Sequence, residues 1–293
     1  MIRFASYTDV GTRKPINEDS HCIEHAVLPL GEAVMAVVCD GVGGLSSGDY
    51  VSNLVVDMFA DWFESFADSV GRGASDLTPA EVLDNTRNAW GALLATANQE
   101  IKAHSELEGK RSGTTFSGLL AFGGRYLVGQ VGDSRVYHLG SDGIAQLTQD
   151  QTWVARELAR GTITAQKAKT HPKRNMILQA VGSQSNLRPV FSSGEYAADD
   201  MFVLCCDGFY HNNPAREIFD AFSPVRKTDN ERLRKTCAAL TRKAMDLGER
   251  DNITVCVVEM DGSFAYGPEP VLHDDTTTRQ LYDEDCPTAD LGQ

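Results

Sequence analysis

The sequence is poor in positive charge. Its 27 Lys and Arg residues stand against 41 Asp and Glu residues, which gives a net charge of -14 at pH 7 and a pI near 4.9. Nucleic-acid backbones and anionic membrane surfaces are bound by an excess of Lys and Arg. The composition therefore argues against a nucleic-acid or membrane partner.

Long apolar runs are also missing. No run approaches the roughly 18 residues that a membrane-spanning helix needs, and the opening stretch MIRFASYTDV lacks the apolar core of a signal peptide. We therefore expect a cytoplasmic protein. With 293 residues, 42% of them hydrophobic, the chain can bury a large core in one large domain or two small ones.

The cysteines show no metal-binding or disulfide pattern. There are seven, an odd number, and none has CxxC spacing. Several lie inside apolar runs, namely Cys39, Cys205, Cys206 and Cys256, which predicts reduced, structural thiols. His21 and His25 have the spacing of a helical zinc pair, but their surroundings favour a strand, so we interpret them as two partly exposed histidines.

Apolar runs and helix-start signals indicate an α+β protein. Strands are predicted at 34–39, 115–122, 126–131, 135–139, 201–206 and 252–258. Capping boxes at TPAE (78–81) and TDNE (228–231) predict two helices, the second ending at Gly248, and a third helix is predicted over about 48–66. Strands in hairpin-like runs with helices inserted in pairs favour largely antiparallel sheets.

Acidic residues fall at the ends of these strands. Asp40, Asp133 and Asp207 follow strands, whereas Glu18, Asp19 and Asp251 come just before strands begin. In antiparallel neighbours, the end of one strand lies beside the start of the next. We therefore expect Glu18 to meet Asp40 and Asp207 to meet Asp251 at one edge, and the hairpin over 123–124 to bring RSGTT beside Asp133.

Carboxylates crowded together in this way need cations. In a partly dry site they would raise one another's pKa unless divalent ions neutralised them, and oxygen ligands without Cys or His select Mg²⁺ or Mn²⁺. In the stretch VVCDGVGG, the Gly41 carbonyl is a further candidate ligand, and Gly43 and Gly44 leave space for water. The alternative is that each Asp-Gly is only a turn. This explains any single acid well, but it explains poorly why four acids lie at matching strand ends.

Seven short motifs occur in the order typical of one family. They are NEDS (17–20), DGVGG (40–44), SGTT (112–115), VGDSRVY (131–137), ILQAVGS (177–183), CDG (206–208) and DNITV (251–255). From about residue 5 to 260 the chain thus resembles the protein phosphatase 2C family of metal-dependent serine/threonine phosphatases, in its compact bacterial form. The resemblance implies a four-layer α-β-β-α sandwich, and we expect a catalytic domain over 1–262.

The resemblance also implies roles for individual residues. Asp40 would bridge two metal ions, with Glu18 and the Gly41 carbonyl completing one and Asp207 and Asp251 the other. Asp133 matches a weaker third metal position shared with Asp207, Asp19 would hold metal-bound water, and Asn252 would steady the Asp251 loop. Water activated by two Mn²⁺ or Mg²⁺ ions would then hydrolyse phosphoserine or phosphothreonine directly, and SGTT would serve strand entry and backbone support.

The chain departs from the family pattern at three positions. Lys14 stands where the family has a phosphate-binding Arg, with Arg13 beside it, so either side chain could hold the phosphate. Val42 stands where many eukaryotic members have a histidine. His211 occupies a place where relatives often carry another acid, so the sequence does not decide whether the third metal site forms.

Two segments carry further charge. Residues 151–174 form a basic island within an expected flap at about 149–185, and this island is interpreted either as that flap or as a solvated helical face. Residues 263–293 are expected to be an acidic, disordered tail. The expected partners are phosphorylated proteins, opposing a serine/threonine kinase, with the enzyme acting as a monomer. The alternatives are a catalytically weak, phosphatase-like regulator that recognises phosphoproteins, and a metal-dependent nuclease, which the net charge disfavours.

Overall fold

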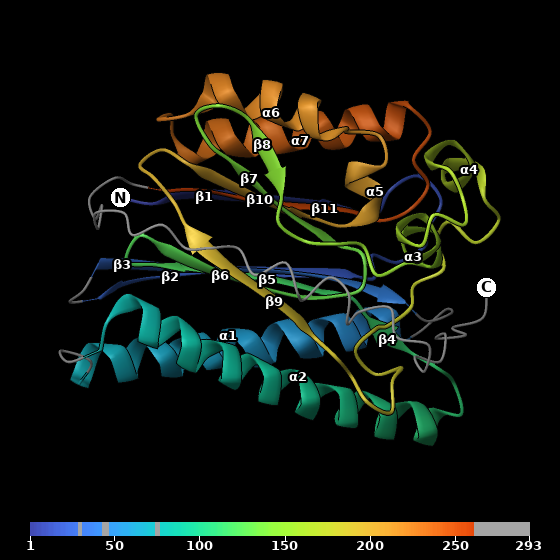
Figure 1. Cartoon of the computed structure of the whole chain (residues 1–293), viewed down its shortest axis with the longest axis horizontal. Helices are drawn as coiled ribbons and strands as arrows, with labels where there is room; N and C mark the ends of the chain where they lie inside the picture. Colours follow the sequence, from blue (N-terminus) through green and yellow to red (C-terminus); the bar gives the residue numbers. More distant parts are fainter. Residues whose placement is uncertain (29–30, 43–46, 74–76, 261–293) are drawn as a thin grey trace.

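Two antiparallel sheets stack face to face in the computed structural model, which describes residues 1–28, 31–42, 47–73 and 77–260 (Figure 1). The first sheet has the order β1 (Arg3–Asp9), β11 (Ile253–Glu259), β10 (Met201–Cys205), β7 (Arg135–Leu139), β8 (Ile144–Gln146). The second has the order β2 (Asp19–Leu28), β3 (Gly31–Val42), β5 (Phe116–Phe122), β6 (Arg125–Val131), β9 (Val190–Glu195), and the short β4 (Gly113–Thr114) pairs with β3.

Helices cover the outer face of each sheet. The pair α1 (Gly48–Gly73) and α2 (Pro79–Glu108) lies on the second sheet, and α6 (Ala215–Phe222) and α7 (Asn230–Asp246) lie on the first (Figure 1). The short helices α3 (Trp153–Ala159), α4 (Ala165–Thr170) and α5 (Asp207–Tyr210) gather at one end of the sandwich, and a 3-10 turn, η2 (Ser223–Val225), follows α6. The predicted α-β-β-α architecture is confirmed. Among the described helices, none is long and apolar enough to cross a membrane.

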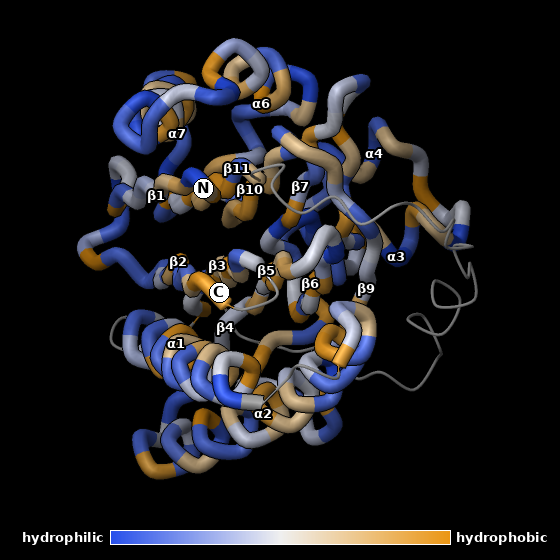
Figure 2. Tube along the Cα trace, turned by 90° about the vertical axis from the view of Figure 1, so that its left-hand side faces the viewer, coloured by the Kyte–Doolittle hydropathy of each residue, from blue (hydrophilic) through white to orange (hydrophobic). Residues whose placement is uncertain are grey.

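Strand β3 is buried on both of its faces. Val34, Ala36 and Val38 belong to the core cluster between the sheets, whereas Met35 and Val37 belong to the cluster under α1 and α2. This double burial explains why residues 33–39 of β3 are continuously apolar, without the alternation of a half-exposed strand. Figure 2, which looks nearly along the strands, shows hydrophobic residues among them between the two helix layers.

Trp90 on α2 lies at the centre of the cluster beneath the second sheet. Its side chain is fully buried, and its ring packs edge-on against Phe59 of α1 and Phe116 of β5, with centroid separations of 5.3 and 5.9 Å. The contacts join both helices to the sheet. They fix the position of α1, whose first turn lies next to the functional site.

One predicted capping box is confirmed and the other is wrong, while the third predicted helix begins at Gly48 as expected. The Thr78 side chain accepts from the Glu81 N–H at 3.3 Å, and Glu81 accepts from the Thr78 N–H at 2.9 Å, which is the predicted capping box of α2. In α7, however, the cap is Asp229, whose Oδ1 accepts from the Arg232 N–H at 2.7 Å. The Thr228 hydroxyl instead bonds the Val225 carbonyl. TDNE contains two adjacent N-cap residues, and the sequence does not rank them.

The remaining differences concern exposed or edge segments. Helix α1 extends to Gly73 rather than 66, and the edge strand β1 escaped prediction because its burial is mixed and its sequence, RFASYTD, is largely polar. Gly248 has φ +95°, which fits the predicted end of α7. The six described cysteines are free thiols, as expected. The acidic segment 263–293 lies outside the described residues.

Candidate metal centre

Antiparallel pairing brings the acidic strand ends together. Asp19, the first residue of β2, is the register partner of Asp40 near the end of β3. Ligand atoms of Asp19, Asp40 and Cys206 all lie within 4.8 Å of one another. Asp207 follows β10 as the first residue of α5, and Asp251 precedes the antiparallel strand β11, so the second predicted pair lies at the same end of the sandwich.

Electrostatic coupling shows how closely these acids are grouped. The pKa of Asp40 is raised well above its ordinary value, first by burial and then by the charges of Asp19, Asp207, Asp251 and Asp133. Asp133, in the connection between β6 and β7, has its own pKa raised by burial and by Asp207. The five predicted aspartates therefore lie near enough to act on one another's charge, and within this group Asp19 and Asp40 have ligand atoms within 4.8 Å of each other.

The SGTT segment holds the backbone of Asp40. The Asp40 N–H donates to the Thr115 hydroxyl at 2.9 Å, and the Asp40 carbonyl accepts from the Thr115 N–H at 2.9 Å and from the Thr114 hydroxyl at 3.0 Å. The Thr115 hydroxyl also lies 2.7 Å from that of Ser134, beside Asp133. These bonds confirm the expected backbone support and fix the direction in which Asp40 projects.

Glu18 is packed against the first turn of α1. Its carbonyl accepts from the Gly41 N–H at 3.1 Å and from the Ser52 hydroxyl at 2.6 Å. A Cβ on Gly48 would lie 2.3 Å from Glu18 Oε1, so only glycine leaves room for this carboxylate. Sequence reasoning missed Gly48 and Ser52. The only signal was a glycine at the start of a helix, which by itself is unremarkable.

Asn252 joins the Glu18 segment to the start of β11. Its Oδ1 accepts from the Glu18 N–H at 2.9 Å, and its Nδ2 donates to the carbonyls of Val10 and Ile16 at 2.9 and 3.1 Å. Its own N–H donates to Asp251 Oδ1 at 2.9 Å. Asn252 therefore contacts both the Asp251 turn and the 10–18 loop.

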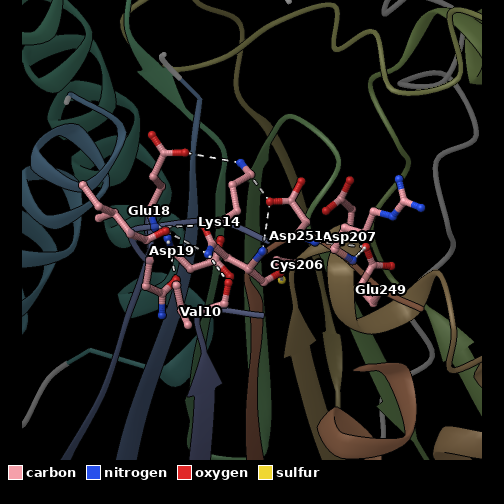
Figure 3. A network of polar contacts seen from close by, with 12 residues as sticks. Val10, Lys14, Glu18, Asp19, Cys206, Asp207, Glu249 and Asp251 are labelled. Atoms are coloured by element: carbon pink, nitrogen blue, oxygen red, sulfur yellow. Dashed lines mark hydrogen bonds and ion pairs between the residues drawn. The ribbon is translucent and has the colours of Figure 1, made fainter. Parts of the chain in front are cut away.

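Lys14 lies between two of the carboxylates. Its Nζ is 3.0 Å from Asp251 Oδ1 and 3.3 Å from Glu18 Oε2 (Figure 3). Burial alone would lower the pKa of Lys14, but hydrogen bonding and charge from Asp251, and then Glu18, raise it above its usual value. Lys14 thus stays cationic near neutral pH. Its neighbour Arg13 is exposed.

Asp19 has an unusual environment for a carboxylate. Both of its oxygens are buried, and neither has a hydrogen-bond partner of normal geometry among the described residues. Burial raises the pKa of Asp19 to about 7; the nearby Thr254 hydroxyl and Cys206 thiol partly oppose this, and the charges of Asp207 and Asp251 add to it. Burial likewise raises the pKa values of Glu18 and Asp207, against the opposing charges of Lys14 and His211 respectively.

The donor set fits hard divalent cations. Carboxylate oxygens are the ligands that Mg²⁺ and Mn²⁺ prefer, and cations would relieve the repulsion that raises these pKa values. Cys206 does not change this, because its Sγ contacts the Asn252 carbonyl and the Thr254 N–H. Burial raises the pKa of its thiol well above the ordinary value, which keeps it protonated. Gly43 and Gly44 lie outside the described residues.

A cavity of about 620 Å³ opens beside Asp133 and Asp207. One wall contains Arg135, which donates from Nε and Nη2 to the two oxygens of Asp150 at 2.8 and 2.6 Å and lies 3.6 Å from the centre of the Tyr210 ring. His211 also lines the cavity, with Nδ1 4.0 Å from Asp207 Oδ2. Sequence reasoning did not find Asp150 or Tyr210, because their link to Arg135 exists only in three dimensions.

Comparisons with known proteins agree with this geometry. The family model described as Protein phosphatase 2C matches residues 12–244. Protein phosphatase PhpP of Streptococcus pneumoniae is 28% identical over 256 residues, covering 87% of this chain and 96% of the relative. The chain therefore belongs to the protein phosphatase 2C family.

Two solved structures extend the comparison. The Mycobacterium tuberculosis serine/threonine phosphatase PstP/Ppp is 28% identical, with a TM-score of 0.71 over 89% of this chain and 99% of that one. The catalytic domain of the serine threonine protein phosphatase PstP, solved in complex with two manganese ions, is 27% identical, with a TM-score of 0.68 over 89% and 98% of the two chains.

Proposed function

We propose that this chain is a metal-dependent protein serine/threonine phosphatase that hydrolyses phosphoserine and phosphothreonine in proteins. The observation that carries the proposal is the group of partly and fully buried carboxylates at one end of the sandwich, where Asp40 is the register partner of Asp19 and their ligand atoms lie within 4.8 Å. Burial and the neighbouring charges raise the pKa of Asp40, which divalent cations would relieve. Membership of the family and the names of the relatives support the substrate class.

Mn²⁺ or Mg²⁺ ions would be held by the carboxylates of Asp40, Glu18, Asp207 and Asp251, together with the Gly41 carbonyl, and Asp133 would contribute to a third, weaker position. Divalent ions bound there supply a water of lowered pKa and compensate the negative charge of a phosphoryl group. The manganese-bound relative supports this choice of metal.

The chain's own residues would bind and orient the reactants. Lys14, which stays cationic, supplies positive charge beside Glu18 and Asp251, where it can pair with a phosphate oxygen. Asp19, whose two buried oxygens have no hydrogen-bond partner among the described residues, would hold metal-bound water. Arg13 remains the second candidate for binding the phosphate. Because Arg13 is exposed whereas Lys14 is half-buried, we favour Lys14.

A phosphatase-like regulator without activity is the alternative. Such a protein would be expected to lose metal-binding residues, whereas all the predicted ligand positions carry oxygen donors here. Hydrolysis of p-nitrophenyl phosphate and of a phosphothreonine peptide, measured against Mn²⁺ concentration, separates the two. We expect turnover that rises with Mn²⁺ and stops with EDTA; no turnover of either substrate at saturating Mn²⁺ would favour the regulator.

The setting of the reaction is also part of the proposal. The free thiols of the described cysteines are compatible with a reducing compartment such as the cytoplasm. We place the enzyme there as a monomer acting against a serine/threonine kinase. Gel filtration and phosphoproteomics of a deletion strain test these points directly.

A further inference from the structure

The flap beside the metal centre is anchored at its base. The Trp153 N–H donates to the Met176 carbonyl at 2.8 Å, and the Leu178 N–H donates to the Gln151 carbonyl at 2.7 Å. Above this base, the Trp153 ring stacks on His171 with a centroid separation of 4.5 Å. Side chains carried by α4 and by the segment after it therefore have defined positions relative to the cavity.

The basic residues of the flap differ in their surroundings. Arg156 and Arg160 pair with Glu157, and Lys173 lies 5.2 Å from the centre of the Trp153 ring. Lys169 and Arg174 instead line the cavity, are exposed, and form no ion pair with any described residue.

The acidic residues that line the cavity do not serve as counterions for Lys169 and Arg174. Asp150 is neutralised by its bidentate pair with Arg135. Asp133 and Asp207 belong to the carboxylate cluster that would hold metal ions. Lys169 and Arg174 thus provide the unbalanced positive charge on the flap side of the cavity.

We propose that Lys169 and Arg174 bind an acidic side chain of the substrate close to the phosphorylated residue, so that the enzyme prefers phosphosites flanked by Asp or Glu. This specificity rests on the proposed phosphatase function and deepens it. A cavity of 620 Å³ is about 10 Å across, which an extended peptide spans with about three residues. The acidic residue therefore lies within about three positions of the phosphoserine or phosphothreonine.

The preference must come from local contact and not from the general field of the protein. The net charge of -14 repels acidic peptides at long range. Salt screens that repulsion over about 8 Å at physiological ionic strength, whereas direct contacts to the two flap cations persist at shorter range. A general electrostatic effect would consequently oppose the preference that we propose.

The test compares two phosphothreonine peptides that differ only in flanking residues, three Glu against three Gln. For the Mn²⁺-loaded enzyme we expect a kcat/KM about tenfold higher for the Glu peptide, mainly through KM. Lys169→Glu/Arg174→Glu should abolish this ratio and favour a peptide flanked by Lys. Lys169→Glu and Lys167→Glu are the matched single variants, since each reverses one exposed cation of α4 and only Lys169 lines the cavity.

The outcomes separate the two proposals. An equal kcat/KM for both peptides, or a ratio that survives the double charge reversal, contradicts the specificity while leaving the phosphatase function intact. A ratio that Lys167→Glu reduces as much as Lys169→Glu does would show a general charge effect and would also overturn the specificity. Absence of hydrolysis of either peptide by the wild type is instead a failure of the phosphatase function.

Discussion

At the scale of single residues, the site depends on which side chain meets which neighbour. Asp40, Asp207 and Asp251 could be predicted as a group because strand ends in antiparallel sheets meet in a regular way. The contacts of Gly48 with Glu18, and of Arg135 with Asp150 and Tyr210, could not be predicted. They join segments whose relative positions are set by the packing of whole helices.

Lys14 is expected to bind the substrate phosphate. Lys14→Ala should raise KM for a phosphopeptide more than Arg13→Ala does, because the half-buried Lys14 already lies among the ligands of the site. Lys14→Arg should keep activity, since its fork can bind phosphate through two hydrogen bonds. Steady-state kinetics at saturating Mn²⁺ measures the ranking, and the opposite ranking would assign the phosphate to Arg13.

His211 is expected to influence the choice of metal. It lies beside Asp207 and lines the cavity with Asp133, and imidazole nitrogen suits Mn²⁺ better than Mg²⁺. We predict that the enzyme prefers Mn²⁺, and that His211→Asp lowers the Mg²⁺ concentration needed for half-maximal activity. Mg²⁺ titrations of the two proteins check this; superimposable curves would leave His211 without a metal role.

At the scale of elements, local sequence signals predicted whether a segment is a helix or a strand better than they predicted the residues at which it begins and ends. The capping box at Thr78 specifies its helix start without ambiguity, whereas two possible caps at Thr228 and Asp229 led to a one-residue error. Strand β3 was visible because both of its faces are buried. Edge strand β1 was not, because mixed burial removes the apolar pattern on which sequence reasoning depends.

The cap of α2 should contribute measurably to stability. Thr78→Ala removes the side-chain acceptor for the Glu81 N–H and should lower the free energy of unfolding by about 1 kcal/mol. Urea denaturation of the metal-free protein measures the change. Thr96→Ala, in the exposed middle of the same helix, is the control; an equal or larger loss there would show that the cap itself contributes nothing.

At the scale of the whole molecule, the fold gathers acidic side chains at one end of the sandwich. Strand runs and paired helices predicted largely antiparallel sheets, whereas the four-layer sandwich was predicted from the family resemblance of the seven ordered motifs. The sequence could not provide the shape of the flap, since α3 and α4 have no buried residues and thus no apolar stripe to predict them.

The clustered carboxyl groups make the stability of the metal-free protein depend on pH. Asp19 has a pKa of about 7 against an ordinary 3.8, and the pKa of Asp40 is also raised. Between about pH 4 and pH 7 the native state holds protons that the unfolded chain has released, so stability falls as pH rises through this window. In EDTA, the Tm of Asp40→Asn should exceed that of the wild type by a margin that grows with pH. If the two Tm curves ran parallel across this pH range, the proposed repulsion between Asp40 and its acidic neighbours would be contradicted.

The central claim is that the carboxylate cluster around Asp40 is the metal site on which catalysis depends. Its most direct test is phosphothreonine-peptide hydrolysis by purified Asp40→Asn, with circular dichroism to check the fold and calorimetric Mn²⁺ titration to follow binding. We predict a folded protein that has lost tight Mn²⁺ binding and whose kcat is lower by about a thousandfold or more. A folded variant with near-normal Mn²⁺ affinity and turnover would contradict the account.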